Sequence, residues 1–194
     1  MQNYSSCKGL ILTVFGSEIF IQMKVDILLM PEINKEKILS ILEKVTDPEI
    51  PVLSIIDLGI VRDVEIDSFN KIKIIITPTY TGCPAMDVIN MNIRMALFEH
   101  GFKNFEIESV LSPAWTTDWM SEKGKEKLMT YGIAPPKPVP VVCTPDAFQK
   151  EEAIQCPHCN SYHTKLVSRF GATACKALYK CEECKEPFEY FKCH

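Results

Sequence analysis

The stretch Cys156-Pro157-His158-Cys159, followed by Cys181-Glu182-Glu183-Cys184, decides the fold of the C-terminal part of the chain. Two CxxC pairs can bring four soft thiolates to one tetrahedral ion, and the residues between them suffice for two knuckles joined by a small antiparallel sheet. The spacing predicts a zinc ribbon over residues 151–194, with these four cysteines as the metal ligands. Because so small a module has little core, roughly 10–16 kcal/mol of metal-binding free energy would become folding free energy.

Two alternatives for these cysteines are a pair of disulfides and a redox-active CxxC. Nine cysteines without a secretory signal indicate a reducing compartment, in which thiols bind metals or carry chemistry, so we expect a cytoplasmic protein. Cys175 and Cys193 also fall inside the predicted ribbon. We expect them to be packed thiols, with a replacement ligand or a second metal as the alternative. The remaining cysteines are Cys7, Cys83 and Cys143.

Composition and charge argue against two classes of partner. The 194 residues are 46% hydrophobic and 24% charged, as in ordinary soluble proteins, and the net charge is −4. Nucleic-acid binding needs clustered Lys and Arg, and no such cluster is visible. The apolar run at residues 9–30 contains Glu18, Lys24 and Asp26, and each would cost about 2.5–3.5 kcal/mol at a bilayer centre. We therefore expect no nucleic-acid partner and no membrane span.

Residues 1–33 are expected to form an N-terminal extension, for which two interpretations stay open. The β-branched residues in this stretch suit an extra strand or two. Alternatively, Met30-Pro31-Glu32-Ile33-Asn34 reads like the start of a domain, which would make the preceding stretch an artefact of the gene model. Residues 134–150 begin with Ala134-Pro135-Pro136-Lys137-Pro138-Val139-Pro140 and are expected to be a stiff linker, because polyproline II is the default of such a stretch.

Residues 34–133 are expected to form a small α+β domain. Ile38, Ile41, Leu42 and Val45 recur at helical spacing behind a candidate N-cap, Asn34. Residues 60–66 and 71–77 alternate with period two around a turn, which predicts a β-hairpin. A helix from Pro84 closed by a glycine at 101, a strand over 105–111 and a short polar helix over 121–131 follow.

Cys83 is the candidate working residue of this domain. It lies at the predicted strand-to-helix corner, where free backbone N–H groups and the helix dipole favour a thiolate. The hydroxyls of Thr77, Thr79 and Thr81 lie beside it in the sequence. A thiolate there can hold a metal or cluster, act as a nucleophile, or simply pack as a small hydrophobe. The nucleophile needs a base, and the one nearby histidine, His100, lies at the far end of the helix.

Asp47 and Glu49 flank Pro48 at the exit of the first helix and can place two carboxylates beside the Cys83 corner. The alternative is an Asp-Pro turn in which Asp47 binds the backbone. Trp115 and Trp119 are candidates for an apolar patch at the mouth of the same site, although tryptophans are more often core. These residues extend the candidate site beyond a single thiol.

The combination of Asp47-Pro48-Glu49, the hairpin and Gly82-Cys83-Pro84-Ala85 resembles iron-sulfur targeting domains of the SufT type. Pro113-Ala114-Trp115-Thr116 and the tail Phe170-Gly171-Ala172-Thr173-Ala174-Cys175-Lys176-Ala177-Leu178-Tyr179-Lys180-Cys181 narrow the match. The whole pattern, over residues 34–194, resembles the PaaD family, the D subunits of ring-1,2-phenylacetyl-CoA epoxidases. In that family the four ribbon cysteines fall on the zinc positions.

The resemblance implies an accessory subunit of a multicomponent oxygenase in aerobic phenylacetate degradation, without catalytic activity alone. It implies maturation or insertion of the iron or iron-sulfur centre of a partner, which would be an oxygenase or reductase subunit. Structural zinc and a transient iron or iron-sulfur cluster are the implied cofactors, with Cys83, Asp47, Glu49 and Thr81 handling the iron. The alternatives are a general iron-sulfur carrier with other clients and a thiol-dependent enzyme using Cys83. A homodimer stays open.

Overall fold

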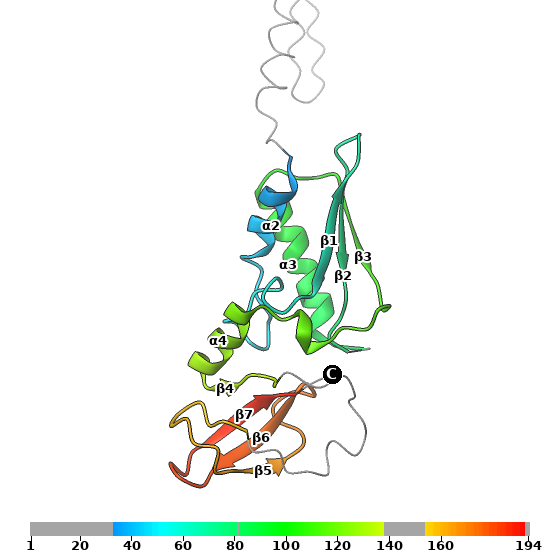
Figure 1. Cartoon of the computed structure of the whole chain (residues 1–194). Helices are drawn as coiled ribbons and strands as arrows, with labels where there is room; N and C mark the ends of the chain where they lie inside the picture. Colours follow the sequence, from blue (N-terminus) through cyan, green and yellow to red (C-terminus); the bar gives the residue numbers. More distant parts are fainter. Residues whose placement is uncertain (1–32, 81, 138–153, 193–194) are drawn as a thin grey trace, which may run out of the picture. The chain divides into compact units, whose positions relative to one another are not determined.

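Two small sheets organise the residues that the structure describes, which are 33–80, 82–137 and 154–192 of a computed structural model (Figure 1). One sheet has the strand order β1-β2-β3 and the other the order β4-β7-β6-β5. All of these elements belong to one compact unit, Asn34–His194. Residues 1–32 of the expected extension and residues 138–150 of the linker expected over 134–150 lie outside the described residues. No helix in the described ranges has the length and apolarity to cross a membrane.

Helix α2 (Lys35–Leu42) begins where the sequence predicts. The Asn34 side chain accepts a hydrogen bond of 2.8 Å from the backbone N–H of Lys37, so Asn34 is the N-cap. Ile38, Ile41 and Leu42 form the buried face. The helix ends three residues earlier than the pattern suggested, because Val45 is already part of the turn that leads to Pro48.

The first sheet combines the predicted hairpin with a parallel crossover. Strands β1 (Val61–Ile66) and β2 (Ile72–Ile76) pair antiparallel, and β3 (Phe105–Ser109) pairs parallel with β2. Helix α3 (Ala85–Glu99) makes the crossover and lies with α2 on one side of the sheet (Figure 1). Its N-cap is Pro84 and its C-cap is His100, so the left-handed Gly101 predicted to close it comes one residue later.

The core of this α/β module is almost entirely aliphatic. Its fully buried side chains come from both helices, the sheet and the loop after α2. They include Ile38, Leu42, Leu53, Ile55, Ile60, Ile72, Ile74, Ile76, Ile89, Ile93 and Leu97. In β2 the alternation leaves Lys73 on the outer face, where it pairs with Glu108. The predicted period-two pattern is therefore the burial pattern.

Helix α4 (Glu122–Tyr131) is anchored on a buried carboxylate. Asp57 accepts hydrogen bonds from the Ser54 backbone N–H at 3.2 Å and from the hydroxyl of Ser121, the N-cap of α4, at 3.0 Å. It also pairs with Lys127 of the same helix. Burial opposes ionisation of Asp57, but the hydrogen bonds from Lys127 and the two serines outweigh it and lower its pKa. Asp57 is thus a charged anchor for α4.

Asp57→Asn is expected to lower the free energy of unfolding at pH 7 by about 2 kcal/mol, because partly buried donors lose a charged acceptor. Since the folded-state pKa lies below the ordinary 3.8, the stabilisation is present above that value and disappears as pH falls through the folded-state pKa. Denaturant titration of both chains between pH 7 and 2 measures the difference. A gap that stays constant over this range would contradict the ionic role.

The second sheet belongs to the ribbon predicted over residues 151–194, of which the structure describes residues 154–192. Strands β5 (Thr164–Ser168), β6 (Lys176–Cys181) and β7 (Pro187–Phe191) pair antiparallel in sequence order. Strand β4 (Ile133–Ala134) follows α4 directly and pairs parallel with β7. The α+β class with a C-terminal ribbon is confirmed, and the ribbon sheet takes one short strand from the chain ahead of the proline-rich stretch.

Candidate functional site

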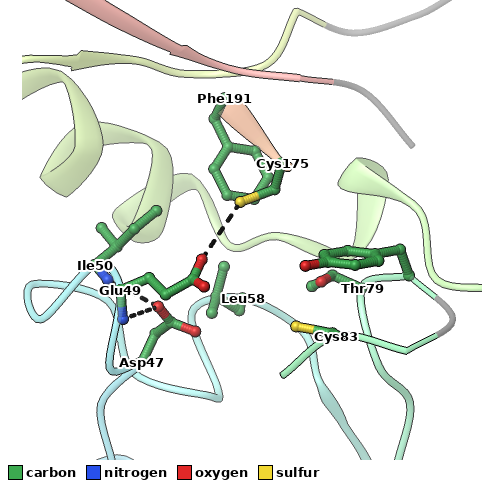
Figure 2. Close-up of a pocket in the computed structure, with 9 residues that line it drawn as sticks. Asp47, Glu49, Ile50, Leu58, Thr79, Cys83, Cys175 and Phe191 are labelled. Atoms are coloured by element: carbon green, nitrogen blue, oxygen red, sulfur yellow. Dashed lines mark hydrogen bonds between the residues drawn. The ribbon is translucent and has the colours of Figure 1, made fainter. Parts of the chain in front are cut away.

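A small cavity of about 20 Å³ lies where the α/β module meets the ribbon (Figure 2). We call it the Cys83 pocket. Three segments line it: the loop after α2, the segment between β2 and α3, and the facing ends of β6 and β7. The lining residues are Asp47, Glu49, Ile50, Leu58, Thr79, Tyr80, Cys83, Cys175 and Phe191.

Cys83 occupies the predicted corner, just before the Pro84 N-cap of α3. Its backbone N–H donates to the Tyr80 carbonyl at 3.3 Å, and its carbonyl accepts from Met86 N–H at 3.2 Å. The side chain is partly exposed, and its Sγ points into the pocket in Figure 2. No side chain caps this helix end, and the dipole of α3 places its positive end next to Cys83.

The sequence left open whether the segment of Asp47 and Glu49 forms an Asp-Pro turn or places two carboxylates beside Cys83, and the structure shows both. The Oδ1 of Asp47 accepts hydrogen bonds of 2.8 Å from the backbone N–H groups of Glu49 and Ile50, as in an Asp-Pro turn. Both carboxylates also line the Cys83 pocket. Burial raises the pKa of Asp47, although the two backbone bonds and the charge of Lys176 act against it. The turn therefore fixes two acidic groups opposite the thiol.

Of the hydroxyl-bearing residues near Cys83 in the sequence, some line the pocket and others do not. Thr79 and Tyr80 line the pocket, and burial together with a hydrogen bond to Cys83 raises the pKa of Tyr80 to about 12. Thr77 is buried and does not line the pocket, and its Oγ1 has no hydrogen-bond partner among the described residues. Thr81, predicted to handle iron with Cys83, lies outside the described residues.

Cys175 and Phe191 bring the ribbon into the pocket. Cys175 is 6% exposed, and its thiol faces Glu49 Oε2 at 3.8 Å. The Cys175 carbonyl accepts from Lys192 N–H at 2.9 Å, which ties the start of β6 to the end of β7. Gly171 lies just ahead of this turn, and its backbone N–H donates to the Lys176 carbonyl at 2.8 Å.

Neither tryptophan lines the pocket. Trp115 is buried, its indole N–H donates to the Leu58 carbonyl at 2.9 Å, and its ring meets Phe191 edge-on with centroids 6.3 Å apart. The guanidinium carbon of Arg62 lies 3.3 Å from the ring centroid of Trp119. Trp115 is therefore core behind the pocket wall, and the apolar patch considered from the sequence is absent from the described lining.

The four ribbon cysteines converge as their spacing predicts. Their sulfur atoms all lie within 4.8 Å of one another, and they are the one group of three or more potential metal ligands that the described residues bring so close. The Cys156–Cys184 and Cys159–Cys181 sulfur pairs are 3.7 and 3.5 Å apart. A tetrahedral ion with metal–sulfur bonds of about 2.3 Å needs sulfur atoms about 3.8 Å apart. The cluster fits one such ion.

The two knuckles are built alike. In each, the backbone N–H of the first cysteine donates to the carbonyl five residues later, from Cys156 to Ser161 at 2.8 Å and from Cys181 to Glu186 at 3.0 Å. In each, the residue after the second cysteine has a positive φ, 62° at Asn160 and 67° at Lys185. This repeated turn aims the sulfurs and backbone N–H groups of both knuckles at one point.

Without a cation, the thiols of the cluster differ in how readily they ionise. Burial opposes ionisation of Cys181, but backbone N–H groups of Cys184 and Glu183 outweigh it and lower its pKa to about 7. The Glu186 N–H favours the thiolate of Cys184, yet burial and the neighbouring thiols raise its pKa to about 12. A bound divalent cation favours the ionised form of all four thiols, Cys184 included, because it attracts each thiolate.

Sequence reasoning placed Cys83, Asp47 and Glu49 as the candidates, and the fold brings all three to one pocket. It treated Cys175 as a packed thiol of the ribbon and did not connect it to Cys83. It also missed Tyr80, Leu58 and Phe191. The tail around Cys175 was a signal of resemblance, but nothing in its spacing indicated which part of the other module it faces.

Two family models match the chain. An iron-sulfur cluster assembly protein model matches residues 35–100, and a PaaD zinc β-ribbon domain model matches residues 142–192. Together with the pocket and the four-cysteine cluster, these matches define the class: an iron-sulfur assembly domain joined to a metal-binding zinc-ribbon domain.

A protein of Escherichia coli strain K12, provisionally named as the D subunit of 1,2-phenylacetyl-CoA epoxidase, is 46% identical over 163 residues, covering 84% of this chain and 94% of that protein. The chain belongs to this family, the PaaD family of 1,2-phenylacetyl-CoA epoxidase D subunits. An iron-sulfur protein maturation auxiliary factor of Bacillus subtilis is 39% identical over 97 residues, covering 50% of this chain and 94% of that protein.

Among solved structures, a domain of unknown function from Bacillus anthracis is 32% identical and gives a TM-score of 0.46, covering 48% of this chain and 90% of that one.

Proposed function

We propose that the protein is an accessory factor of a phenylacetyl-CoA epoxidase and helps to load the iron or iron-sulfur centre of a partner subunit. The observation that carries the proposal is the Cys83 pocket, in which a partly exposed thiol faces Asp47 and Glu49 within an iron-sulfur assembly domain. The relatives' names support the same role, since one is a D subunit of this epoxidase and another a maturation auxiliary factor.

The chemistry of the pocket suits transfer of a metal better than catalysis. A carrier must release its cargo, so a partly exposed thiol with a few weak neighbours suits it better than a closed cage of four thiolates. A cysteine nucleophile needs a base to activate it, and no histidine is among the described residues lining the pocket. We infer that Cys83, Asp47, Glu49 and Thr81 handle iron and that the client completes the transfer.

For the ribbon we propose structural zinc. Four thiolates at tetrahedral spacing make a closed site with no open position for substrate. Zinc suits such a site because it has no redox chemistry and accepts tetrahedral thiolate coordination without strain. The ribbon then holds the facing end of β6 and β7 in place while the assembly domain handles the cargo.

Cys83→Ala is expected to reduce restoration of epoxidase activity to below about one tenth of that given by the unchanged protein, because the exposed ligand is lost. The assay combines the oxygenase and reductase subunits, produced without this protein, with either chain in the absence of oxygen, followed by measurement of turnover and of iron in the client.

The matched control is Cys143→Ser, which removes a thiol outside the described residues and should restore activity fully. Both variants should keep one metal ion per ribbon and an unchanged circular dichroism spectrum. Full restoration by Cys83→Ala would rule out the proposed role. Restoration of unrelated iron-sulfur enzymes to the same extent would favour the general carrier that the maturation-factor relatives suggest.

A further inference from the structure

Cys175 and Glu49 approach each other across the junction of the two modules. Cys175 comes from the ribbon at the start of β6, and Glu49 from the loop after α2. Their Sγ and Oε2 atoms are 3.8 Å apart, joined by the dashed line in Figure 2. Two ligands of one tetrahedral ion, with metal–sulfur and metal–oxygen bonds of about 2.3 and 2.1 Å, lie about 3.6 Å apart. The pair therefore already has the spacing of two metal ligands.

We propose that the ribbon completes the iron-handling site: Cys175 and Glu49 bind a single ferrous ion between the two modules, and Cys83 supplies the third ligand. This deepens the proposed function, on which it depends, because it names the cargo as one ion and assigns a ligand to the ribbon. The four-cysteine cluster takes no part in this binding and keeps its own metal.

The pocket has room for a single ion. Its volume is about 20 Å³, while roughly 10–15 Å³ suffices for one water molecule. One ion fits the pocket as it stands. The polar groups that face this space are the thiols, the two carboxylates and the hydroxyls of Thr79 and Tyr80.

The ligand set is incomplete at rest, which suits release. Cys83 is not within 4.8 Å of both Cys175 Sγ and Glu49 Oε2, since only the ribbon cysteines form so close a group among the described residues. In Figure 2, Cys83 and Glu49 face each other across Leu58. A side-chain rotation of Cys83 or a bridging water must close the set. An ion held by two fixed ligands and one movable ligand exchanges more readily than one in a closed cage.

The charges around the pocket favour a cation. Asp47 and Glu49 are acidic. Of the two lysines near Cys175, the buried Lys176 is paired with Glu189 at 2.7 Å, and the Lys192 ammonium donates to the Arg169 carbonyl at 3.1 Å. Binding the ion requires loss of the thiol protons of Cys175 and Cys83 to solvent. Burial raises the pKa of Cys175, so the ion must displace a firmly held proton and binding should weaken as pH falls.

The test uses the full-length protein with its ribbon metal in place and titrates it with Co²⁺ without oxygen, as an optical substitute for Fe²⁺. The unchanged protein should bind one Co²⁺ beyond the ribbon metal and develop cobalt–thiolate charge-transfer absorption. Cys175→Ser should weaken binding by at least the roughly 10–100-fold that loss of an outer-shell partner causes, with reduced absorption. Glu49→Gln should weaken binding while leaving the absorption per bound ion unchanged.

Two controls match these changes. Cys143→Ser removes a thiol outside the described residues. Glu43→Gln neutralises an exposed carboxylate at the C-cap of α2, just before the loop that carries Glu49. Both variants should bind Co²⁺ like the unchanged protein. If Cys175→Ser and Glu49→Gln bind Co²⁺ undiminished while Cys83→Ser does not, the part assigned to the ribbon is overturned and the iron-handling function of Cys83 stands. If the unchanged protein binds no Co²⁺ beyond the ribbon metal, the single-ion site is overturned.

Discussion

Cys181→Ser is expected to reduce the metal content of the ribbon to below about one tenth of an ion per chain and to unfold the ribbon. Cys181 is fully buried, and it belongs to a core of only five buried residues, two of which are metal-binding cysteines. A core of this size cannot replace roughly 10–16 kcal/mol of metal-binding free energy. Loss of the ion therefore removes most of what holds strands β5, β6 and β7 together.

Hydrogen exchange followed by mass spectrometry measures this effect by region. Residues 164–191 should lose protection, whereas α3 and the β1-β2 hairpin should keep it, because their aliphatic core contains no metal ligand. Cys143→Ser is the matched control and should leave metal content and exchange unchanged. Protection of β6 and β7 in a metal-free Cys181→Ser chain would show that the ribbon folds without its ion.

Local sequence patterns predicted the elements of this fold well. The signals that worked each act over a few residues, so a short stretch of sequence is enough to recognise them. They are the N-cap Asn34, the alternation in β1 and β2, and the CxxC pairs of the ribbon. The errors lie at element ends: at Val45 and Gly101 for the helices, and in the third strand, which was expected over 105–111 and ends at Ser109. The pairing of β4 with β7 could not be predicted, since it joins segments far apart in the sequence.

The site was predictable only within the first module. Asp47, Glu49 and Cys83 lie at an exit and an entrance of helices, and such ends meet at one edge of an α/β layer. Cys175 depends on how the ribbon packs, which is fixed by side chains such as Trp115 and Phe191 rather than by a spacing rule. A thiol that completes a pocket and a thiol that merely packs look the same in a sequence.

Trp115→Ala is expected to lower the free energy of unfolding by about 3–5 kcal/mol, the range for removal of a buried aromatic side chain. The change deletes a ring packed edge-on against Phe191 and leaves the Leu58 carbonyl without its indole donor. Because Leu58 and Phe191 both line the Cys83 pocket, the same change should also weaken Co²⁺ binding there. Urea denaturation and the Co²⁺ titration measure the two effects on one sample.

Trp119→Ala is the matched control, because it removes the same side chain from a half-buried position. Stacking of Arg62 on Trp119 is worth about 0.5–2 kcal/mol, so the expected loss of stability is smaller and Co²⁺ binding should not change. Trp115→Phe keeps a ring against Phe191, so its loss of stability should lie between those of Trp115→Ala and Trp119→Ala. Equal losses for Trp115→Ala and Trp119→Ala, with Co²⁺ affinity unaffected in both, would mean that Trp115 does not fasten the ribbon to the pocket. We expect a large loss of both stability and Co²⁺ affinity in Trp115→Ala alone. That result would mean that this one buried ring connects the packing of the two modules to the geometry of the metal ligands.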